Sequence, residues 1–405
     1  MKAHFIIGKN FGDEGKGLAT DFFASRALED GMPCLVVRHN GGAQAGHTVD
    51  THDARFVFHQ LSAGSFRRAD TFWADTFLPD LFKLSEEEES FFSVSRFTPR
   101  ILSFGGCRCV VIDDVLVNML LETSRGDRRH GSCGMGIDEA VQRSSHHDCL
   151  VTLRDVKSMT ASDLYRKLKR IRREYLPERL RLLGISLSSD EYSELLRGDN
   201  VVYHAAEGMC RGVQRVELIE REKLADYGEV VFEGAQGLLL DEMYLDYAPH
   251  LTSSRTGLGQ PLSLCRELFP SAETQAVYVT RSYVTRHGRG PLPYDGAFDL
   301  QRYPVCDLTN IPNEWQGSLR FAPHGTYREF IEPVQNDLNG AKISCAIMVT
   351  HLNETDQRIV TVNGAMTVEE WIDRYHIREH FDAVYLSSNP CSVKMEKLLL
   401  YGEKS

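Results

Sequence analysis

The sequence lacks the features of membrane, secreted and nucleic-acid-binding proteins. No apolar run approaches the roughly 18 residues that a membrane helix needs, and residues 1–5 show no signal-peptide pattern. The 46 Lys and Arg residues are outnumbered by 57 Asp and Glu residues, which argues against a basic face for nucleic acid. Ten cysteines are scattered through 405 residues, so reduced thiols are expected. These absences predict a cytoplasmic protein that binds neither membranes nor nucleic acid.

Repeats and low-complexity linkers are also absent, and the apolar residues form short continuous runs instead. Such runs are typical of strands in a parallel sheet that is buried on both faces. Leu164, Leu168, Ile171 and Tyr175 follow helical spacing. The pattern predicts one α/β domain over residues 1–405, with a large, mainly parallel central sheet, flanking helices and a helical insertion at about 155–225. The predicted strand runs are Cys34–Val37, Val110–Ile112, Val230–Phe232, Ala276–Val279, Ala346–Val349 and Ala383–Leu386.

The most informative segment is the glycine-rich run Gly8–Gly17, which directly follows the apolar run Phe5–Ile7. A strand, a glycine loop and a helix start together form a phosphate-binding cradle. The common phosphate loop reads G-x-x-x-x-G-K-[ST], but here Asn10 takes the first glycine position and Gly17 replaces the hydroxyl residue. Asp13 also lies inside the loop. Because a carboxylate repels a polyphosphate, this acid needs a metal to share or a proton to take.

Polar segments follow four of the other predicted strands. In α/β sheets, ligands gather where strands end and loops begin. Five such loops can surround one cleft. Besides the first loop, these segments are Asn40–Thr48, Glu233–Gly237, Thr350–Asn353 and Ser387–Pro390.

Each polar residue also has a plainer explanation when it is taken alone. Asp13 could cap the following helix, and Lys16 could be a surface lysine. His47 could be an ordinary polar loop residue, or it could face a phosphate. Gln236 could bond its own backbone in a turn, or it could read a base with an amide that both donates and accepts.

Taken together, these segments resemble the adenylosuccinate synthetases, including the aminoadenylosuccinate synthetases of aminoadenine-containing phages. Gly12–Gly17 matches the family's G-D-E-G-K-G, and Phe232–Asp241 matches its F-E-G-A-Q-G-x-L-L-D. The matches continue in order to about residue 395. Three further segments resemble family patterns: Asn40–Thr48 resembles G-G-x-N-A-G-H-T, Leu251–Ser254 resembles V-T-S-S, and Thr285–Arg286 with Gly288–Pro291 resembles T-R-V-G-x-G-P.

The resemblance implies a ligase that joins L-aspartate to C6 of a purine nucleoside monophosphate such as IMP. A nucleoside triphosphate gives its γ-phosphoryl group to O6 of the base, and the amine of aspartate then displaces that phosphate. The product is adenylosuccinate or a close analogue, made in purine nucleotide biosynthesis. The resemblance also implies a homodimer in which one subunit reaches into the site of the other, with Arg143 as a candidate for the reaching residue.

The resemblance further implies roles for individual residues. Asp13 would take the N1 proton of the base and touch Mg²⁺, and the carbonyl of Gly46 would be a second Mg²⁺ ligand. His47 would act as an acid and stabilise the leaving phosphate. Gln236 would help to stabilise the activated purine base. The implied nucleotide-binding residues are Gly12, Glu14, Gly15, Lys16, Gly17, Thr48, Asn353 and Ser388. The implied substrate-binding residues are Gln44, Ser132, Cys133, Arg143, Thr252, Arg286, Ser318 and Arg320.

Three segments depart from the family pattern. The loop T-T-G-R-G-I-G appears as Ser132–Asp138, with Met135 in place of the arginine. The aspartate-binding segment reads Asn313–Phe321 and keeps one arginine, Arg320, which leaves the identity of the amino acid open. The family's T-K-L-D ends here in Asn353. An amide donates as well as accepts, so we expect ATP or dATP to serve as donor in place of GTP.

The acceptor base is not fixed by the sequence. Some phage relatives that use dGMP carry a small hydroxyl residue in place of the loop aspartate, so the retained Asp13 favours IMP. Divergence at Gln44 and Cys133 leaves GMP and dGMP open, and no residue settles the sugar. A nucleotide sensor that has lost ligation and a simple NTP hydrolase are the alternatives. The joint presence of Asp13, His47 and Gln236 favours the ligase.

Overall fold

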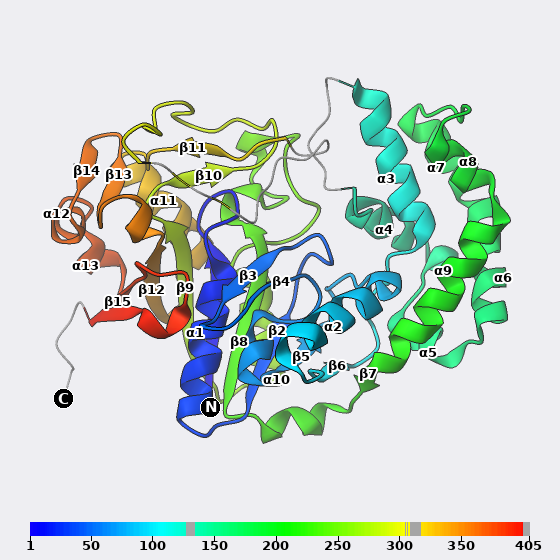
Figure 1. Cartoon of the computed structure of the whole chain (residues 1–405), viewed down its shortest axis with the longest axis horizontal. Helices are drawn as coiled ribbons and strands as arrows, with labels where there is room; N and C mark the ends of the chain where they lie inside the picture. Colours follow the sequence, from blue (N-terminus) through cyan, green and yellow to red (C-terminus); the bar gives the residue numbers. More distant parts are fainter. Residues whose placement is uncertain (127–133, 304, 306, 308–316, 400–405) are drawn as a thin grey trace.

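The computed structural model describes residues 1–126, 134–303, 305, 307 and 317–399. Within them, a ten-stranded sheet runs through the molecule (Figure 1). Its neighbouring strands pair in parallel except for β15 and β16, which are antiparallel. The large, mainly parallel sheet predicted from the sequence is therefore confirmed. In spatial order the strands are β16 (Glu396–Leu399), β15 (Ala383–Leu386), β12 (Ser344–Thr350), β9 (Glu273–Arg281), β1 (Lys2–Gly8), β8 (Glu229–Gly237), β2 (Cys34–Arg38), β5 (Asp70–Trp73), β6 (Ile101–Ser103) and β7 (Val216–Leu218).

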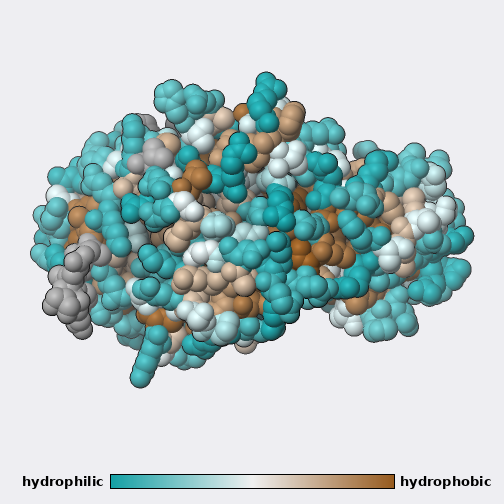
Figure 2. Space-filling model, turned by 90° about the horizontal axis from the view of Figure 1, so that it is seen from below, coloured by the Kyte–Doolittle hydropathy of each residue, from teal (hydrophilic) through white to brown (hydrophobic). Residues whose placement is uncertain are grey.

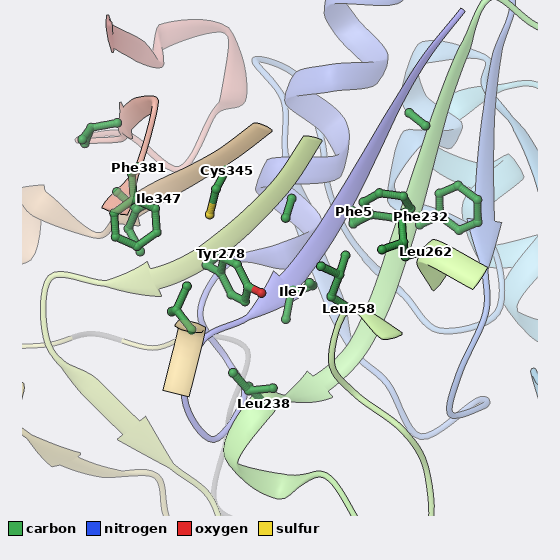
Figure 3. Packing of buried hydrophobic residues seen from close by; sticks show 14 of the residues in the cluster. Phe5, Ile7, Phe232, Leu238, Leu258, Leu262, Tyr278, Cys345, Ile347 and Phe381 are labelled. Atoms are coloured by element: carbon green, nitrogen blue, oxygen red, sulfur yellow. The ribbon is translucent and has the colours of Figure 1, made fainter. Parts of the chain in front are cut away.

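Successive residues of the central strands point to opposite sides of the sheet. Both faces of the sheet therefore carry apolar side chains, and helices pack on each of them. Phe5 and Ile7 of β1 pack in one apolar cluster, with residues from α10 (Gly259–Leu268), α11 (Tyr327–Leu338) and α12 (Val368–Arg374). Ile6 lies in the cluster on the other face, with residues of α1 (Lys16–Glu29). Figure 3 shows the first cluster, in which Phe5, Phe232 and Tyr278 line up from neighbouring strands. The short helix α13 (Ile377–His380) follows α12.

Beyond the β7 edge of the sheet, helices form a lobe on one side of the molecule (Figure 1). It contains the predicted helical insertion, whose helices run from residue 153 to 212. The insertion ends earlier than expected, because residues 216–218 form β7 of the main sheet. The lobe helices are α3 (Ile112–Arg125), α4 (Ile137–Ser144), α5 (Leu153–Ser158), α6 (Ala161–Glu174), α7 (Leu176–Leu183), α8 (Glu191–Arg197) and α9 (Asp199–Gly212); α2 (Leu81–Ser95) packs against α9.

One predicted strand is wrong. Val111 is extended, but neither it nor Val110 belongs to a named strand, and Ile112 begins α3. Asp114 explains the outcome, because its carboxylate accepts the backbone N–H of Val111 at 2.9 Å and so caps the helix. The other predicted runs lie in β2, β8, β9, β12 and β15.

Three small antiparallel pairs lie beside the main sheet: β3 (His47–Asp50) with β4 (Arg55–Phe58), β10 (Val284–Arg286) with β11 (Arg320–Ala322), and β13 (Ile359–Thr361) with β14 (Gly364–Met366). Figure 2 shows one face of the molecule, which is mostly hydrophilic with apolar side chains gathered right of centre. Among the described helices, none is both long and apolar enough to cross a bilayer.

Candidate functional site

The first glycine loop joins the end of β1 to the start of α1. The Glu14 carboxylate is buried beneath it and accepts the backbone N–H groups of Asn10 at 3.0 Å and Gly12 at 2.8 Å. It also pairs with Nζ of Lys16 at 2.8 Å. Gly15, the residue before α1, has a φ of 98° and offers no side-chain cap. The first N–H groups of α1 are therefore available to an anion, while Glu14 shapes the loop from below.

Two cavities lie on either side of this loop. The Gln236 cavity has a volume of about 530 Å³, and the Asn353 cavity has a volume of about 290 Å³. Both are lined by Asp13, Lys16, Gly46 and His47. The residues expected to act on the reacting groups thus stand where the two cavities meet.

The Gln236 cavity gathers three of the predicted substrate-binding residues, Gln44, Thr252 and Arg286, together with the predicted catalytic residues. Gln236 has a φ of 66° at the end of β8. Arg286 is 2% exposed and donates to the carbonyl oxygens of Pro291 and His250 at 2.8 and 3.0 Å. Burial, and then the charge of Arg320, lowers the pKa of Arg286 to about 10. The predicted residues that line this cavity are Gly12, Asp13, Lys16, Gln44, Gly46, His47, Gln236, Thr252 and Arg286.

The Asn353 cavity gathers the predicted donor residues Gly15, Gly17, Thr48 and Asn353. Ser388 is not among its lining residues, and its hydroxyl donates to the side-chain oxygen of Gln357. The next two residues of that loop, 389 and 390, do line the cavity.

His47 is held by a buried carboxylate. Its Nδ1 lies 2.7 Å from Oε1 of Glu233, and Nε of Arg38 lies 3.7 Å from Oε2 of the same group. Burial lowers the pKa of His47, and the charge of Glu233 only partly opposes the shift. Burial would raise the pKa of Glu233, but His47 and Arg38 outweigh it and hold that pKa low. Because an ionised carboxylate only accepts hydrogen bonds, Nδ1 carries the proton and Nε2 is left for a ligand.

Asp13 stands in a strained conformation for a non-glycine residue, with a φ of 61°. Its carbonyl oxygen accepts from Nε of Arg281 at 2.6 Å, and its Oδ2 lies 4.0 Å from Nε2 of His287. The backbone is therefore fixed by a buried arginine while the carboxylate faces both cavities.

The predicted Mg²⁺ ligands Asp13 and Gly46 lie at the junction of the cavities. Among the described residues there is no cluster of three or more His, Cys, Asp and Glu side chains. One carboxylate with one carbonyl fits the way proteins hold Mg²⁺ together with substrate phosphates and water. The donor set thus suits a cation that arrives with a nucleoside triphosphate.

Arg143 does not join the site. It is 1% exposed, and its guanidinium forms an ion pair with Asp114 at 2.9 Å. Two further N–H groups donate to the carbonyl oxygens of Cys149 and Cys109 at 2.6 and 2.8 Å. These bonds lie within its own chain and hold α3 and α4 together, so Arg143 is not placed to reach into another subunit.

Two other predicted substrate residues, Arg320 and Ser318, are not gathered either. Arg320 donates to Asp295 at 2.6 Å and to the carbonyl oxygens of Gly288 and Gly290. Neither Arg320 nor Ser318 is among the described lining residues of the two cavities. Ser132 and Cys133 lie outside the described residues.

Several lining residues were not predicted from the sequence. His287, His59 and Glu139 line the Gln236 cavity, and Arg281 and His351 line the Asn353 cavity. His287 and His351 had local signals, because His287 stands at the valine position of T-R-V-G-x-G-P and His351 lies within the polar segment Thr350–Asn353. The others reach the site through long-range packing.

Comparisons with known proteins place this site in a family. The family model described as adenylosuccinate synthetase matches residues 5–303. An adenylosuccinate synthetase of Clostridium botulinum (strain 657 / Type Ba4) is 30% identical over 301 residues, which cover 72% of this chain. The chain spans 65% of the length of that curated relative.

Two solved structures share the fold. The fully ligated adenylosuccinate synthetase from Plasmodium falciparum superposes with a TM-score of 0.71 at 16% identity, covering 98% of this chain and 99% of that one. The succinoaminodeoxyadenylate synthetase of cyanophage S-2L gives a TM-score of 0.61 at 14% identity, covering 98% and 95%. The sequence match over most of the described site, with the shared fold, establishes that the chain belongs to the adenylosuccinate synthetase family.

Proposed function

We propose that the chain is a carbon–nitrogen ligase that joins L-aspartate to C6 of a purine nucleoside monophosphate, with a nucleoside triphosphate as co-substrate. The observation that carries the proposal is the junction of two cavities at Asp13, Lys16, Gly46 and His47. A ligase of this kind needs a base that meets a phosphoryl group, and only a shared wall lets one set of residues touch both nucleotides. Family membership supports the same reaction class.

In the first step, Asp13 takes the N1 proton of the acceptor base in the Gln236 cavity. The electrons move to O6, which attacks the γ-phosphorus of the triphosphate in the Asn353 cavity, and the diphosphate leaves. Lys16 and the N–H groups at the start of α1 hold phosphoryl oxygens in line. Mg²⁺ held by Asp13 and the Gly46 carbonyl would neutralise phosphate charge when bound.

In the second step, the aspartate amine attacks C6, the C6–O6 bond breaks, and phosphate leaves. His47 lines both cavities, and its Nε2, once protonated, donates to the departing phosphate. The Glu233 carboxylate, which accepts from Nδ1–H of His47, stabilises that imidazolium. Gln236 stabilises the activated base with its amide.

For the acceptor we propose IMP, because Asp13 is retained as the base for N1. GMP and dGMP are the alternative acceptors. The cyanophage S-2L neighbour is described as bound to dGMP and dATP, which supports keeping a deoxynucleotide pair in the test. For the donor we propose ATP or dATP, because Asn353 is exposed to its cavity with an amide that both donates and accepts. The predicted homodimer and cytoplasmic location stay predictions.

The test is product analysis by mass spectrometry. Purified protein is incubated with Mg²⁺, aspartate, one donor (ATP, dATP or GTP) and one acceptor (IMP, GMP or dGMP). We expect a succinylated nucleotide that forms fastest with IMP and an adenine donor. No succinylated product in any mixture rejects the ligase, and NDP formed without an acceptor indicates an NTP hydrolase. Nucleotide binding without either product indicates a sensor.

Matched variants assign the product to this site. Asp13→Ala and His47→Ala should each abolish product formation while the protein stays folded. Asp53→Ala and His52→Ala serve as controls, because both side chains are about fully exposed on the turn between β3 and β4, at 89% and 96%. Near-normal turnover of Asp13→Ala or His47→Ala contradicts the role given to that residue.

A further inference from the structure

His287 lies beside Asp13 at the wall of the Gln236 cavity. Its Nε2 is 4.0 Å from Oδ2 of Asp13, with side-chain exposures of 15% and 23%. Its Nδ1 is buried and has no hydrogen-bond partner among the described residues. Nε2 is therefore the ring nitrogen that can make a polar contact in the cavity.

Among the described residues, no cationic side chain lies closer to the Asp13 carboxylate than His287 does. Within the described part of the chain, its one ion-pair contact inside 4.0 Å is with His287. The nearby Lys16 is bound to Glu14 instead. Among the described side chains, His287 is therefore the cationic or donor group placed to fix an oxygen of this carboxylate.

The two residues are held close together by their backbones. Oγ1 of Thr285 donates to the carbonyl oxygen of Gly12 at 3.1 Å, which ties the end of β10 to the first loop. Arg286 is anchored by two carbonyl oxygens, and Arg281 fixes the carbonyl of Asp13. A small movement of side chains alone can therefore close the 4.0 Å gap to a hydrogen bond of about 3 Å.

We infer that His287 is a positioning residue for Asp13, a role that rests on the proposed function. Its Nε2–H donates to Oδ2 of Asp13 when a purine nucleotide enters, so that Oδ1 faces the N1 proton of the base. Hydrogen bonds in free enzymes are often long and tighten when the substrate binds. The valine in the family pattern T-R-V-G-x-G-P has no such donor, so this device is a departure of this chain.

The kinetic test compares His287→Val with His287→Gln, whose amide restores an N–H donor. We expect His287→Val to lower kcat at least about tenfold, with the acceptor KM changed less than about threefold, because misplacing a reacting group by 1 Å can cost about 100-fold. His287→Gln should recover kcat to within about threefold of the wild type. His52→Val is the matched control, because it removes an imidazole that is 96% exposed.

Three kinetic results overturn the inference: an unchanged kcat in His287→Val, a raised KM with an unchanged kcat, or a His287→Gln variant no better than His287→Val. A crystal structure of the wild type with IMP or GMP bound is a second test, which measures the contact directly and requires neither turnover nor a variant. The Nε2–Oδ2 distance should fall to about 3.2 Å or less, and a distance still near 4 Å overturns the inference. Absence of succinylated product with a closed hydrogen bond would reject the proposed function but not the contact.

Discussion

Nε of Arg281 donates to the carbonyl oxygen of Asp13 at 2.6 Å and holds that residue in its left-handed conformation. The same guanidinium donates to the hydroxyl of Tyr283 at 2.9 Å and to Asp307 at 2.8 Å. Arg281 lines the Asn353 cavity, whereas the Asp13 carboxylate also faces the Gln236 cavity. One buried cation thus links the wall of the Asn353 cavity to the residue that we propose as the base.

Arg281→Met should lose both this backbone anchor and the ion pair. Because breaking a buried pair costs about 3 kcal/mol or more, we expect a lower free energy of unfolding in urea and at least a tenfold lower kcat. Arg281→Lys should also be impaired, because a lysine cannot donate to three groups in the same fork geometry. Arg26→Met is the control, since Arg26 is 62% exposed. Wild-type kcat in Arg281→Met would show that Asp13 holds its conformation without this bond.

Glu233→Gln tests the orientation of His47. The amide is neutral and cannot stabilise an imidazolium as a carboxylate does, so kcat should fall at least tenfold while the donor KM changes little. Glu229→Gln is a close control, because Glu229 pairs with His4 at 2.6 Å at the start of the same strand and lines neither cavity. If the two variants lose equal turnover, the His47–Glu233 pair acts through stability alone.

Asn353→Asp tests the choice of donor. A carboxylate accepts from the N1–H and 2-amino group of guanine but offers no donor to adenine. We expect the ratio of kcat/KM for GTP to that for ATP to rise at least about tenfold, since unpaired polar groups in a site cost 1–3 kcal/mol. Asn363→Asp, on the exposed turn between β13 and β14, should leave the ratio unchanged. A clear GTP preference in the wild type would contradict the proposed donor.

Lys9 makes stability depend on pH. Its Nζ lies 3.9 Å from the centre of the Phe330 ring, and burial lowers its pKa to about 7 although Glu14 opposes the shift. The unfolded chain keeps this proton up to about pH 10.5, so between pH 7 and 10 it binds more protons than the folded chain. Stability from this group therefore rises with pH over that window.

Lys9→Met should remove this dependence. Relative to the wild type, the rise in the free energy of unfolding from pH 7 to 10 should shrink by roughly 3 kcal/mol, measured by urea unfolding at each pH. Ionisation of cysteines in the unfolded chain affects both proteins equally and cancels in the difference. Lys2→Met, an exposed substitution at the start of β1, the strand that ends just before Lys9, should reproduce the wild-type slope. Parallel slopes for the wild type and Lys9→Met would mean that Lys9 stays protonated in the fold.

The sequence predicted the sheet because parallel strands buried on both faces leave continuous apolar runs, as in β9 and β12. It failed at Val110–Ile112, where the decisive signal was a single capping carboxylate, Asp114, rather than the apolar run. Asp13 and His47 were predicted as site residues because they stand in glycine-rich loops at strand ends, and both line the two cavities. Glu233 lay within a recognised segment, but its bond to His47 spans 186 residues, and no spacing rule predicts such a pairing.

Arg143 shows how a charged residue can mislead when its surroundings are unknown. Its pairing with Asp114 holds α4 against α3, so we expect Arg143→Met to lower the free energy of unfolding by about 3–5 kcal/mol. The kcat of the folded protein should stay within about threefold of the wild type, because no cavity residue loses a contact. Asp114→Asn in the Arg143→Met background should recover part of the stability, since the amide is uncharged and can still accept the N–H of Val111. Mixing Arg143→Met with Asp13→Ala subunits tests the alternative, in which Arg143 reaches into the site of a partner subunit. In that case Arg143→Met alone would be inactive, and the mixture would regain turnover.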